Sequence, residues 1–218
     1  MSTSAMRRYR QTTAAQEDLI GDPGTDRLDL DDVFGRAAPR RLEIGCGHGE
    51  FISQMAQAHP DEDFVGLELD HLRVNKCAHK CLKLGAHNVR LYAGEAEHLV
   101  ARLPAAAFRR IYILFPDPWP KAAHRRRRLV NRAFLHELAR VAAPGCIFVF
   151  ASDTHNYAMQ VLANVSTLPG LWRSLHPAGY MVDVPVRFET VFERHKRAEG
   201  CTIMNLRLER MPSPLSAR

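Results

Sequence analysis

The sequence predicts a single α/β domain with a doubly wound, Rossmann-like sheet that is mostly parallel. Short apolar segments that read as buried strands alternate along the chain with segments that have helical periodicity. A glycine-rich turn follows the first of these strands, and the length of 218 residues suits one well-packed domain. We place the domain at residues 37–210, between an N-terminal arm of residues 1–36 and a C-terminal tail of residues 211–218.

The N-terminal arm is basic at its start and acidic further on. Arg7, Arg8 and Arg10 stand first without acidic neighbours, whereas seven acidic side chains follow in the rest of the arm. Pro23 and Gly24 would interrupt a helix there, so we expect the arm to be flexible. Its basic start can order on a phosphate backbone or remain a solvated tail.

Five short apolar runs predict the parallel strands, and a segment with helical features comes after each of them. The predicted strands cover residues 41–44, 64–69, 89–92, 111–114 and 146–151. The predicted helices cover residues 51–56, 71–84, 95–103, 131–141 and 154–168. Residues 172–210 show no clear helix, but alternating apolar side chains from Thr202 to Leu208 predict a final strand.

The loop after the fourth strand should be stiff, with the sequence Phe-Pro-Asp-Pro-Trp-Pro-Lys from Phe115 to Lys121. Its three prolines exclude helix and sheet and restrict the residues before them. Because open α/β sheets bind ligands at the carboxyl ends of their strands, we take Asp117, Trp119 and Lys121 as functional. A rigid connector with a surface aspartate is the alternative. Trp119 either stacks on a base or covers the end of the sheet.

Gly45, Gly47 and Gly49 form a turn with the spacing G-x-G-x-G between the first strand and the first helix. A dinucleotide-binding turn needs G-x-G-x-x-G to place a pyrophosphate on the helix amino terminus. Here Glu50 follows the third glycine directly, and its carboxylate would repel a pyrophosphate. The turn therefore favours an adenosyl ligand without phosphates, such as S-adenosylmethionine.

Acidic residues stand at the ends of three successive strands. Glu43 can pair with the cationic end of a methionine moiety, Glu68 can accept both ribose hydroxyls, and Glu95 can accept from the adenine amino group. Each one alone would be an ordinary surface residue at a strand end. Three of them together with the glycine turn favour a methyltransferase site.

The composition favours a polyanionic partner and a reducing compartment. The formal net charge is +6, and Arg125, Arg126, Arg127 and Arg128 stand in one run near Lys121. This run either contacts RNA phosphates or forms a solvated loop, and its closeness to the proline-rich loop favours phosphate binding. Five cysteines without a C-x-x-C motif predict a cytoplasmic protein with free thiols and no metal site. No apolar stretch is long enough for a membrane span.

The proline-rich loop resembles a motif of the bacterial tRNA (guanine-N7)-methyltransferase family. The match continues through His124, Arg127, Arg128 and Leu129. Further similar segments are Leu42–Gly45, Gly66–Glu68, Ser152–Asp153, Thr190–Glu193 followed by Gly200, and Arg8–Arg10 of the arm. The resemblance runs through residues 41–208, although residues 170–189 match nothing in the family pattern.

This resemblance implies the class I methyltransferase sheet, with antiparallel last strands, and S-adenosylmethionine as cofactor. The implied cofactor-site residues are Glu43, Glu68, Glu95 and Asp117, and Asp117 is the implied catalytic residue. The implied substrate contacts are Lys121, Asp153, Thr190, Phe192 and Glu193, and the basic run up to Arg128 is the implied RNA contact. Glu95 stands where the family usually has aspartate, and Ser152 where it usually has threonine.

The resulting hypothesis is methyl transfer from S-adenosylmethionine to guanine N7, in the tRNA variable loop by family analogy. N7 has a lone pair and no proton, so alignment, which can supply ~7–11 kcal/mol, matters more than a base. A class I methyltransferase for another RNA or a small molecule is one alternative, and it would turn over without tRNA. A non-enzymatic RNA-binding protein is the other, and it would bind tRNA but not the cofactor. The sequence indicates no obligate protein partner.

Overall fold

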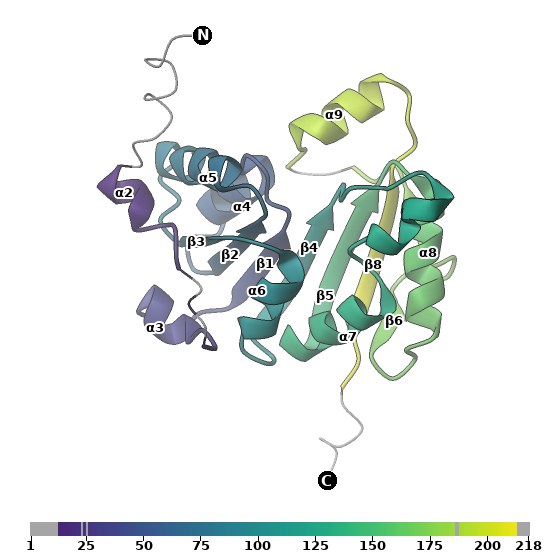
Figure 1. Cartoon of the computed structure of the whole chain (residues 1–218), viewed down its shortest axis with the longest axis horizontal. Helices are drawn as coiled ribbons and strands as arrows, with labels where there is room; N and C mark the ends of the chain where they lie inside the picture. Colours follow the sequence, from purple (N-terminus) through teal and green to yellow (C-terminus); the bar gives the residue numbers. More distant parts are fainter. Residues whose placement is uncertain (1–12, 23, 25, 186–187, 213–218) are drawn as a thin grey trace.

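The fold is a central sheet with helices on both faces (Figure 1), and the computed structural model describes residues 13–22, 24, 26–185 and 188–212. The strand order is β3-β2-β1-β4-β5-β8-β6, with β7 paired to β8. The strands are β1 (Arg40–Ile44), β2 (Asp63–Glu68), β3 (Val89–Ala93), β4 (Phe108–Leu114), β5 (Ala142–Ser152), β6 (Trp172–Ser174), β7 (Met181–Val182) and β8 (Met204–Arg210). Strands β1 to β5 are parallel, whereas β8 is antiparallel to β5, β6 and β7. The predicted doubly wound sheet with an antiparallel C-terminal strand is confirmed.

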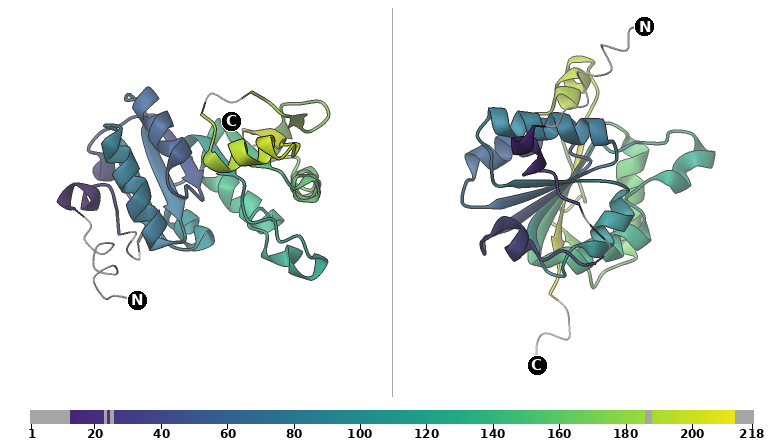
Figure 2. Two further views of the ribbon diagram at one scale, coloured as in Figure 1. Left: turned by 90° about the horizontal axis from the view of Figure 1, so that it is seen from above. Right: turned by 60° about the vertical axis from the view of Figure 1, so that its left-hand side comes forward.

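Two layers of helices cover the two faces of the sheet (Figure 2). Helices α4 (Glu50–Ala58) and α5 (His71–Lys83) bury their apolar stripes on one face. Helices α6 (Ala96–Arg102), α7 (Arg132–Val141) and α8 (His155–Ser166) pack on the other. The Asn131 side chain accepts from the Phe134 amide at 3.0 Å, so α7 begins at the predicted cap. No helix in the described ranges is both long and apolar enough to cross a membrane.

The described residues of the predicted N-terminal arm, 13–22, 24 and 26–36, include segments that pack on the domain, which corrects the expectation of a flexible arm for this part of it. Helices α2 (Ala14–Glu17) and α3 (Leu30–Phe34) form there. Leu19 and Leu30 are only 3% and 1% exposed. The Leu91 amide donates to the Leu19 carbonyl at 2.8 Å, which extends the hydrogen bonding of β3. Burial of these leucines offsets the entropy of ordering the segment. The arginines at positions 7, 8 and 10 lie outside the described residues.

A helix that the sequence did not indicate, α9 (Val191–Ala198), stands over the carboxyl ends of β4 and β5 (Figure 1). The expectation of no clear helix between residues 172 and 210 was wrong. Thr190 caps α9 by accepting from the Glu193 amide at 3.0 Å. Six of its eight residues follow Phe192 and none of them is a large apolar residue, so α9 has no apolar stripe to reveal its period.

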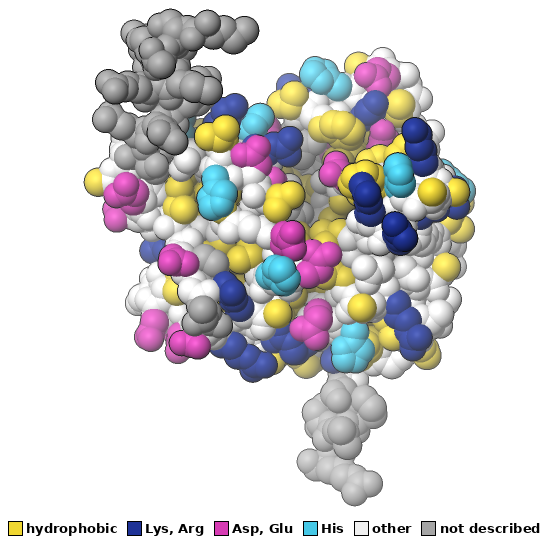
Figure 3. All heavy atoms as spheres, in the orientation of Figure 1, with side chains coloured by type: hydrophobic (Ala, Val, Ile, Leu, Met, Phe, Trp, Pro, Cys, Tyr) yellow, Lys and Arg dark blue, Asp and Glu magenta, His cyan; other side chains and the backbone are white. Residues whose placement is uncertain are grey.

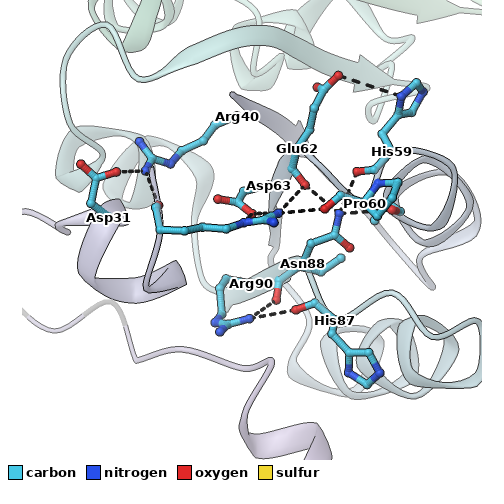
Figure 4. A network of polar contacts seen from close by, with 12 residues as sticks. Asp31, Arg40, His59, Pro60, Glu62, Asp63, His87, Asn88 and Arg90 are labelled. Atoms are coloured by element: carbon cyan, nitrogen blue, oxygen red, sulfur yellow. Dashed lines mark hydrogen bonds and ion pairs between the residues drawn. The ribbon is translucent and has the colours of Figure 1, made fainter. Parts of the chain in front are cut away.

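A polar network fixes the opposite edge of the sheet, where the parallel strands begin (Figure 4). Asp63, which is fully buried, accepts two hydrogen bonds from the Arg36 guanidinium at 2.6 and 2.9 Å. The Asn88 side chain donates to three carbonyl oxygens at the end of α4 and in the turn after it. These bonds satisfy backbone groups that the turn leaves unpaired. The edge where the parallel strands begin is therefore held by structural contacts. The loops at the opposite edge, where these strands end, can form a ligand site.

Candidate functional site

A cavity of about 380 Å³ opens at the carboxyl edge of the sheet, where the strand order reverses between β1 and β4. It receives residues from the loops after four strands. They include Gly45 and Gly47 after β1, Glu68 at the end of β2 with Leu69 after it, Gly94 and Glu95 after β3, and Phe115, Pro116 and Asp117 after β4. Figure 3 shows this hollow near the centre of the face, with apolar surface inside it and acidic side chains at its rim. The predicted convergence of strand ends on one ligand site is therefore observed.

The glycine turn leaves space that a ligand can fill. Gly45 and Gly47 have φ values of 80° and 54°, which side chains other than glycine rarely adopt. A Cβ atom at either position would meet no protein atom within 4 Å, because it would project into open space. Gly49, the third glycine, instead precedes α4 and backs onto Cys77, where an added Cβ would lie 2.6 Å from the sulfur. Two of the three predicted glycines therefore form the cradle and the third sets how α4 packs.

Glu68 is held in one orientation by the backbone around it. Its two carboxylate oxygens accept hydrogen bonds from the Gly47 amide at 3.0 Å and the Asp70 amide at 3.1 Å. The side chain is 7% exposed, and Arg73 Nη1 lies 3.9 Å from it. Each oxygen keeps a further lone pair, so a diol at the cavity can be accepted by both. This geometry suits the ribose of an adenosyl group.

Replacing Glu68 by alanine should weaken S-adenosylmethionine binding about tenfold to a hundredfold. The reason is that hydrogen bonds to a charged group contribute about 1.5–3 kcal/mol, and Glu68 is placed to accept from both hydroxyls. Titration calorimetry on the purified chain measures this affinity. Glu68→Gln, which keeps one acceptor, should fall between the wild type and Glu68→Ala. An unchanged affinity in Glu68→Ala would remove Glu68 from the site.

Glu43 lies behind the cavity and is not part of its lining. It is 5% exposed, and its Oε2 atom is buried without a hydrogen-bond partner among the described residues. Burial raises the pKa of Glu43 well above the usual glutamate value, and neighbouring acidic groups raise it further. A buried carboxyl group with one unpartnered oxygen fits a ligand that brings a cation or a donor. The expected pairing of Glu43 with the methionine end of the cofactor remains a prediction.

Replacing Glu43 by glutamine should stabilise the ligand-free protein at neutral pH and weaken cofactor binding. The pKa of Glu43 is higher in the folded protein than in the unfolded chain. The contribution of Glu43 to the free energy of unfolding is therefore present at acid pH, and it is lost as the pH rises from the usual glutamate pKa through the raised one. Glutamine removes that loss because it does not titrate. Thermal melts across pH, with and without S-adenosylmethionine, measure both effects. A variant less stable than the wild type above pH 7, or equal cofactor affinity, would contradict this role.

Glu95 reaches the same cavity from a more open position. It is the residue before α6, its side chain is 65% exposed, and His98 Nδ1 lies 3.5 Å from its carboxylate. Leu69, 65% exposed, and Ala96 line the same part of the cavity. The Glu95 carboxylate can accept from the edge of an adenine ring, and the apolar surface beside it can pack against the face of the ring. The predicted contact of Glu95 with the adenine amino group is compatible with this position.

The proline-rich loop is strained around Asp117. Phe115 and Trp119, two residues to either side, have φ values of 52° and 40°, which are uncommon for residues other than glycine. The Phe115 amide donates to the Ala151 carbonyl at 2.8 Å and ties the start of the loop to β5. Asp117 is exposed and lines the cavity. Such strain persists where the surrounding structure imposes it, and it is common at functional sites.

Trp119 is not a core residue, and it contacts two residues of the basic segment that follows the loop. Its ring is half-buried and lines the cavity, with the Arg127 guanidinium 4.8 Å from the ring centroid. The His124 ring meets it edge-on with centroids 5.9 Å apart. The cation on its face and the histidine at its edge connect the loop to the basic helix η1 (Ala122–Arg127). These contacts order the start of the basic segment, and stacking of Trp119 on a base remains a prediction.

The predicted substrate residues fall into two groups. Phe192 is 45% exposed, and its ring centroid lies 5.1 Å from that of Phe115 at the cavity. Asp153 is half-buried with Lys196 Nζ at 3.9 Å. Glu193, however, is buried and accepts from the Arg197 guanidinium at 2.6 Å. Phe192 and Asp153 are thus open to a substrate, whereas Glu193 holds α9 together.

Two further predicted residues, Thr190 and Lys121, differ in their surroundings. The Thr190 hydroxyl caps α9, as described above, so its side-chain oxygen already has a structural partner. Lys121 is exposed, lies outside the cavity lining, and precedes η1. A direct substrate contact by either residue remains a prediction, and Lys121 is the better placed of the two because its ammonium group is exposed.

The arginine run divides into an exposed part and a buried residue. Arg125, Arg126 and Arg127 are exposed on η1, whereas Arg128 is only 1% exposed. Lysine and arginine side chains gather beside the hollow in Figure 3. The structure does not favour the expected RNA contact of Arg128, because its guanidinium is enclosed by the protein and has protein acceptors.

Arg73 and Leu69 are among the cavity residues that sequence reasoning missed. Arg73 lines the cavity from the first turn of α5 and lies near Glu68. Leu69, directly after β2, presents apolar surface to it. The N-cap at Asp70 could have indicated the position of Arg73, because the third residue after a cap lies in the first turn at the strand end. Leu69 had no comparable signal, since the predicted strand included it.

The sheet and the site together define the class of protein. The sheet is doubly wound with an antiparallel strand beyond β5, an open glycine turn follows β1, and a fixed carboxylate ends β2. These are the parts of a class I methyltransferase that uses S-adenosylmethionine. Solved structures agree on the fold. A 16S rRNA (adenine(1408)-N(1))-methyltransferase from Catenulisporales acidiphilia, determined with the cosubstrate S-adenosylmethionine, has a TM-score of 0.59 and 18% identity, covering 88% of this chain and 97% of its own. An antibiotic-related methyltransferase has a TM-score of 0.58 and 19% identity, covering 86% and 98%.

Sequence comparisons identify the family. A family model described as "Putative methyltransferase" matches residues 37–206. The tRNA (guanine-N(7)-)-methyltransferase of Nitrosococcus oceani is 35% identical over 217 residues, covering 95% of this chain and 90% of the relative. The enzyme of the same description from Pseudomonas putida is 38% identical over 186 residues, covering 84% and 77%. This chain belongs to the tRNA (guanine-N(7)-)-methyltransferase family.

Proposed function

We propose that this chain transfers a methyl group from S-adenosylmethionine to N7 of a guanosine in tRNA, and that the guanosine lies in the variable loop. The observation that carries the proposal is the position of Asp117, which lines the same cavity as Glu68 on a strained, proline-rich loop. A carboxylate that lines the cofactor cavity can hold a guanine base close to the methyl donor. Membership of the family supports guanine N7 as the acceptor.

The residues around the cavity divide the work of holding the cofactor. Gly45 and Gly47 leave room for the methionine part, Glu68 is placed to accept from the ribose, and Glu95 from the adenine edge. Glu43, buried behind the cavity, is the proposed partner of the cationic end. When bound, S-adenosylmethionine supplies a methyl group on a positively charged sulfonium. The carboxylate of Glu68 favours such a positive ligand electrostatically, and a cation beside Glu43 would favour the charged form of that buried group.

Asp117 is proposed to orient the guanine and to offset the positive charge that develops on the purine. Guanine N7 attacks through its own lone pair and loses no proton, so the site needs no general base. A carboxylate held in place before the reaction stabilises this charge without reorganising. Phe192, next to Phe115 at the cavity, and Asp153 are the further proposed substrate contacts.

Exposed cations beside the cavity are proposed to bind the tRNA backbone. Arg125, Arg126 and Arg127 lie on η1, and Lys121 precedes it. Arg127 also borders the cavity, so the phosphate-binding surface begins at the active-site loop. A backbone held at this surface would bring one of its bases to Asp117.

The purified chain should methylate bulk tRNA without another protein, because the cavity, Asp117 and the exposed arginines all belong to it. The test uses labelled S-adenosylmethionine and bulk tRNA, followed by nucleoside analysis, and we expect label in 7-methylguanosine. Label in another nucleoside, or turnover on a small molecule without tRNA, would favour another class I methyltransferase. Binding of tRNA without binding of the cofactor would contradict an enzyme. The five free cysteines suit the proposed cytoplasmic location.

A further inference from the structure

Arg128 is a buried cation beside the active-site loop. Among the described residues, no carboxylate lies within ion-pair distance of it, and its whole side chain is nearly inaccessible at 1% exposure. Its guanidinium instead donates to neutral acceptors. They are the Pro118 carbonyl at 2.8 Å, the Asn156 carbonyl at 3.3 Å, the Asn156 side-chain oxygen at 2.6 Å and the Gln160 side-chain oxygen at 2.7 Å. The Tyr157 ring centroid lies 4.7 Å from it.

These contacts connect the proline-rich loop to α8. The acceptor in the loop is the carbonyl of Pro118, the residue between Asp117 and the strained Trp119. The other acceptors lie on two turns of α8, which packs on the sheet. A planar guanidinium presents donors in several fixed directions, so one side chain can hold both partners at once. Pro118 has no amide hydrogen, so its carbonyl is the group by which its backbone can be held.

Burial of an arginine without a counter-charge has a substantial cost. Taking a cation out of water is unfavourable by several kcal/mol unless the surroundings compensate it. Here burial, followed by the neighbouring Arg125, lowers the pKa of Arg128, although a guanidinium remains charged at neutral pH. A phosphate-binding arginine does not need such burial, and Arg125, Arg126 and Arg127 are exposed. The enclosed position of Arg128 is therefore explained by its hydrogen bonds to Pro118 and to α8.

We propose that Arg128 is a positioning residue for methyl transfer, which fixes the Pro118 carbonyl and thereby the placement of Asp117 at the cavity, and that it does not bind RNA. The inference rests on the proposed function for the reaction concerned. It separates the arginine run by role: three exposed side chains meet phosphate, and the fourth sets the geometry of the active-site loop.

Replacing Arg128 by methionine should lower the single-turnover rate at saturating tRNA and cofactor on the order of 10²-fold, the loss that follows from a misplaced active-site group. The dissociation constant for tRNA and its salt dependence should stay close to those of the wild type. Arg128→Lys should also be slow, because one compact ammonium group cannot hold Pro118 and the α8 acceptors together. Gln160→Ala, which removes one acceptor, should lower the rate less and covers the case in which Arg128→Met does not fold.

Two methionine variants serve as matched controls. Arg140, at the end of α7, also donates to backbone carbonyls, those of Val100 and Leu103, both at 2.8 Å, but at the opposite edge of the sheet. Arg140→Met should lower the melting temperature and leave the single-turnover rate unchanged. Arg126→Met, on exposed η1, should lower the slope of log affinity against log salt by about 0.7–0.9, the value for one phosphate contact.

A measurement without RNA tests the loop directly. The chain has two tryptophans, and Trp172 is 2% exposed, so acrylamide quenching reports mainly on half-buried Trp119. Quenching should increase in Arg128→Met and stay at the wild-type level in Arg140→Met. This readout is independent of the substrate, so it tests the positioning of the loop even if the wild-type chain were found not to methylate tRNA.

The outcomes separate the possible roles of Arg128. A slow reaction with more accessible Trp119 and an unchanged salt slope supports a positioning residue. A lower salt slope like that of Arg126→Met, with the rate at saturating tRNA intact, would make Arg128 a phosphate ligand and overturn the proposal. A lower melting temperature with unchanged rate and unchanged quenching would make it a stabilising residue only, and would overturn the proposal as well.

Discussion

Replacing Asp117 by asparagine should lower the single-turnover rate of tRNA methylation on the order of 10²-fold or more. Asparagine keeps the shape of the side chain, but it removes the negative charge and turns one acceptor into a donor. Removing a preorganised group that stabilises the charge developing in the transition state lowers reaction rates by a factor of this size. The rate is measured by rapid quenching at saturating tRNA and cofactor. Cofactor affinity should fall less, unless Asp117 also carries the methionine ammonium group.

A matched control for this variant is Asp61→Asn, which makes the same change on an exposed residue in the turn between α4 and β2. That turn lies at the opposite edge of the sheet, so the rate should not change. Equal rates for Asp117→Asn and the wild type would leave Asp117 without a role in transfer. The proposed function would then need another group to hold the guanine.

The pH dependence distinguishes two roles for Asp117. Since N7 has no proton to lose, the wild-type single-turnover rate should be nearly flat from about pH 6 to 8.5, where a tuned general base would leave a limb. A base limb present in the wild type and absent in Asp117→Asn would make Asp117 a proton acceptor. That result would contradict the orienting role and retain the residue as catalytic.

The parallel sheet and the centre of the site could be predicted because both follow from local patterns. Buried parallel strands appear as short apolar runs, and their carboxyl ends must meet at one edge. Glu68, Glu95 and Asp117 therefore converge although they are far apart in sequence. Glu43 shows the limit of this reasoning. Successive residues of a strand face opposite sides, so with Ile44 lining the cavity, Glu43 lies behind it.

The parts that were missed depend on contacts between distant segments. Leu19 and Leu30 stand among acidic residues, and only their packing on the domain shows that this segment is ordered. Helix α9 is polar along most of its length, so it gives no periodic signal. Four consecutive arginines look alike in a sequence, but the end of η1 turns Arg128 toward acceptors on α8 while the others stay exposed. Neither α8 nor the turn of η1 can be located from the arginine run itself.

Replacing Arg125, Arg126 and Arg127 together by alanine should weaken tRNA binding on the order of 10²-fold at 0.1 M salt. Each phosphate contact contributes about 0.7–0.9 to the slope of log affinity against log salt, so this slope should fall by about two to three in total. Binding titrations at several salt concentrations measure both quantities. Arg128 is left in place because it is enclosed and holds the active-site loop. Cofactor affinity should remain nearly constant.

The control removes the same charge from another part of the surface. Lys83, Arg109 and Arg110 are exposed at the edge of the sheet away from the cavity. Their triple alanine variant has the same net charge as the η1 variant, so a general effect of charge on RNA attraction would appear equally in both. If η1 is the contact surface, the slope of log affinity against log salt should fall only in the η1 variant. Equal slopes in the two variants would show that the exposed arginines attract tRNA only through net charge, because specific phosphate contacts depend on where the cations lie.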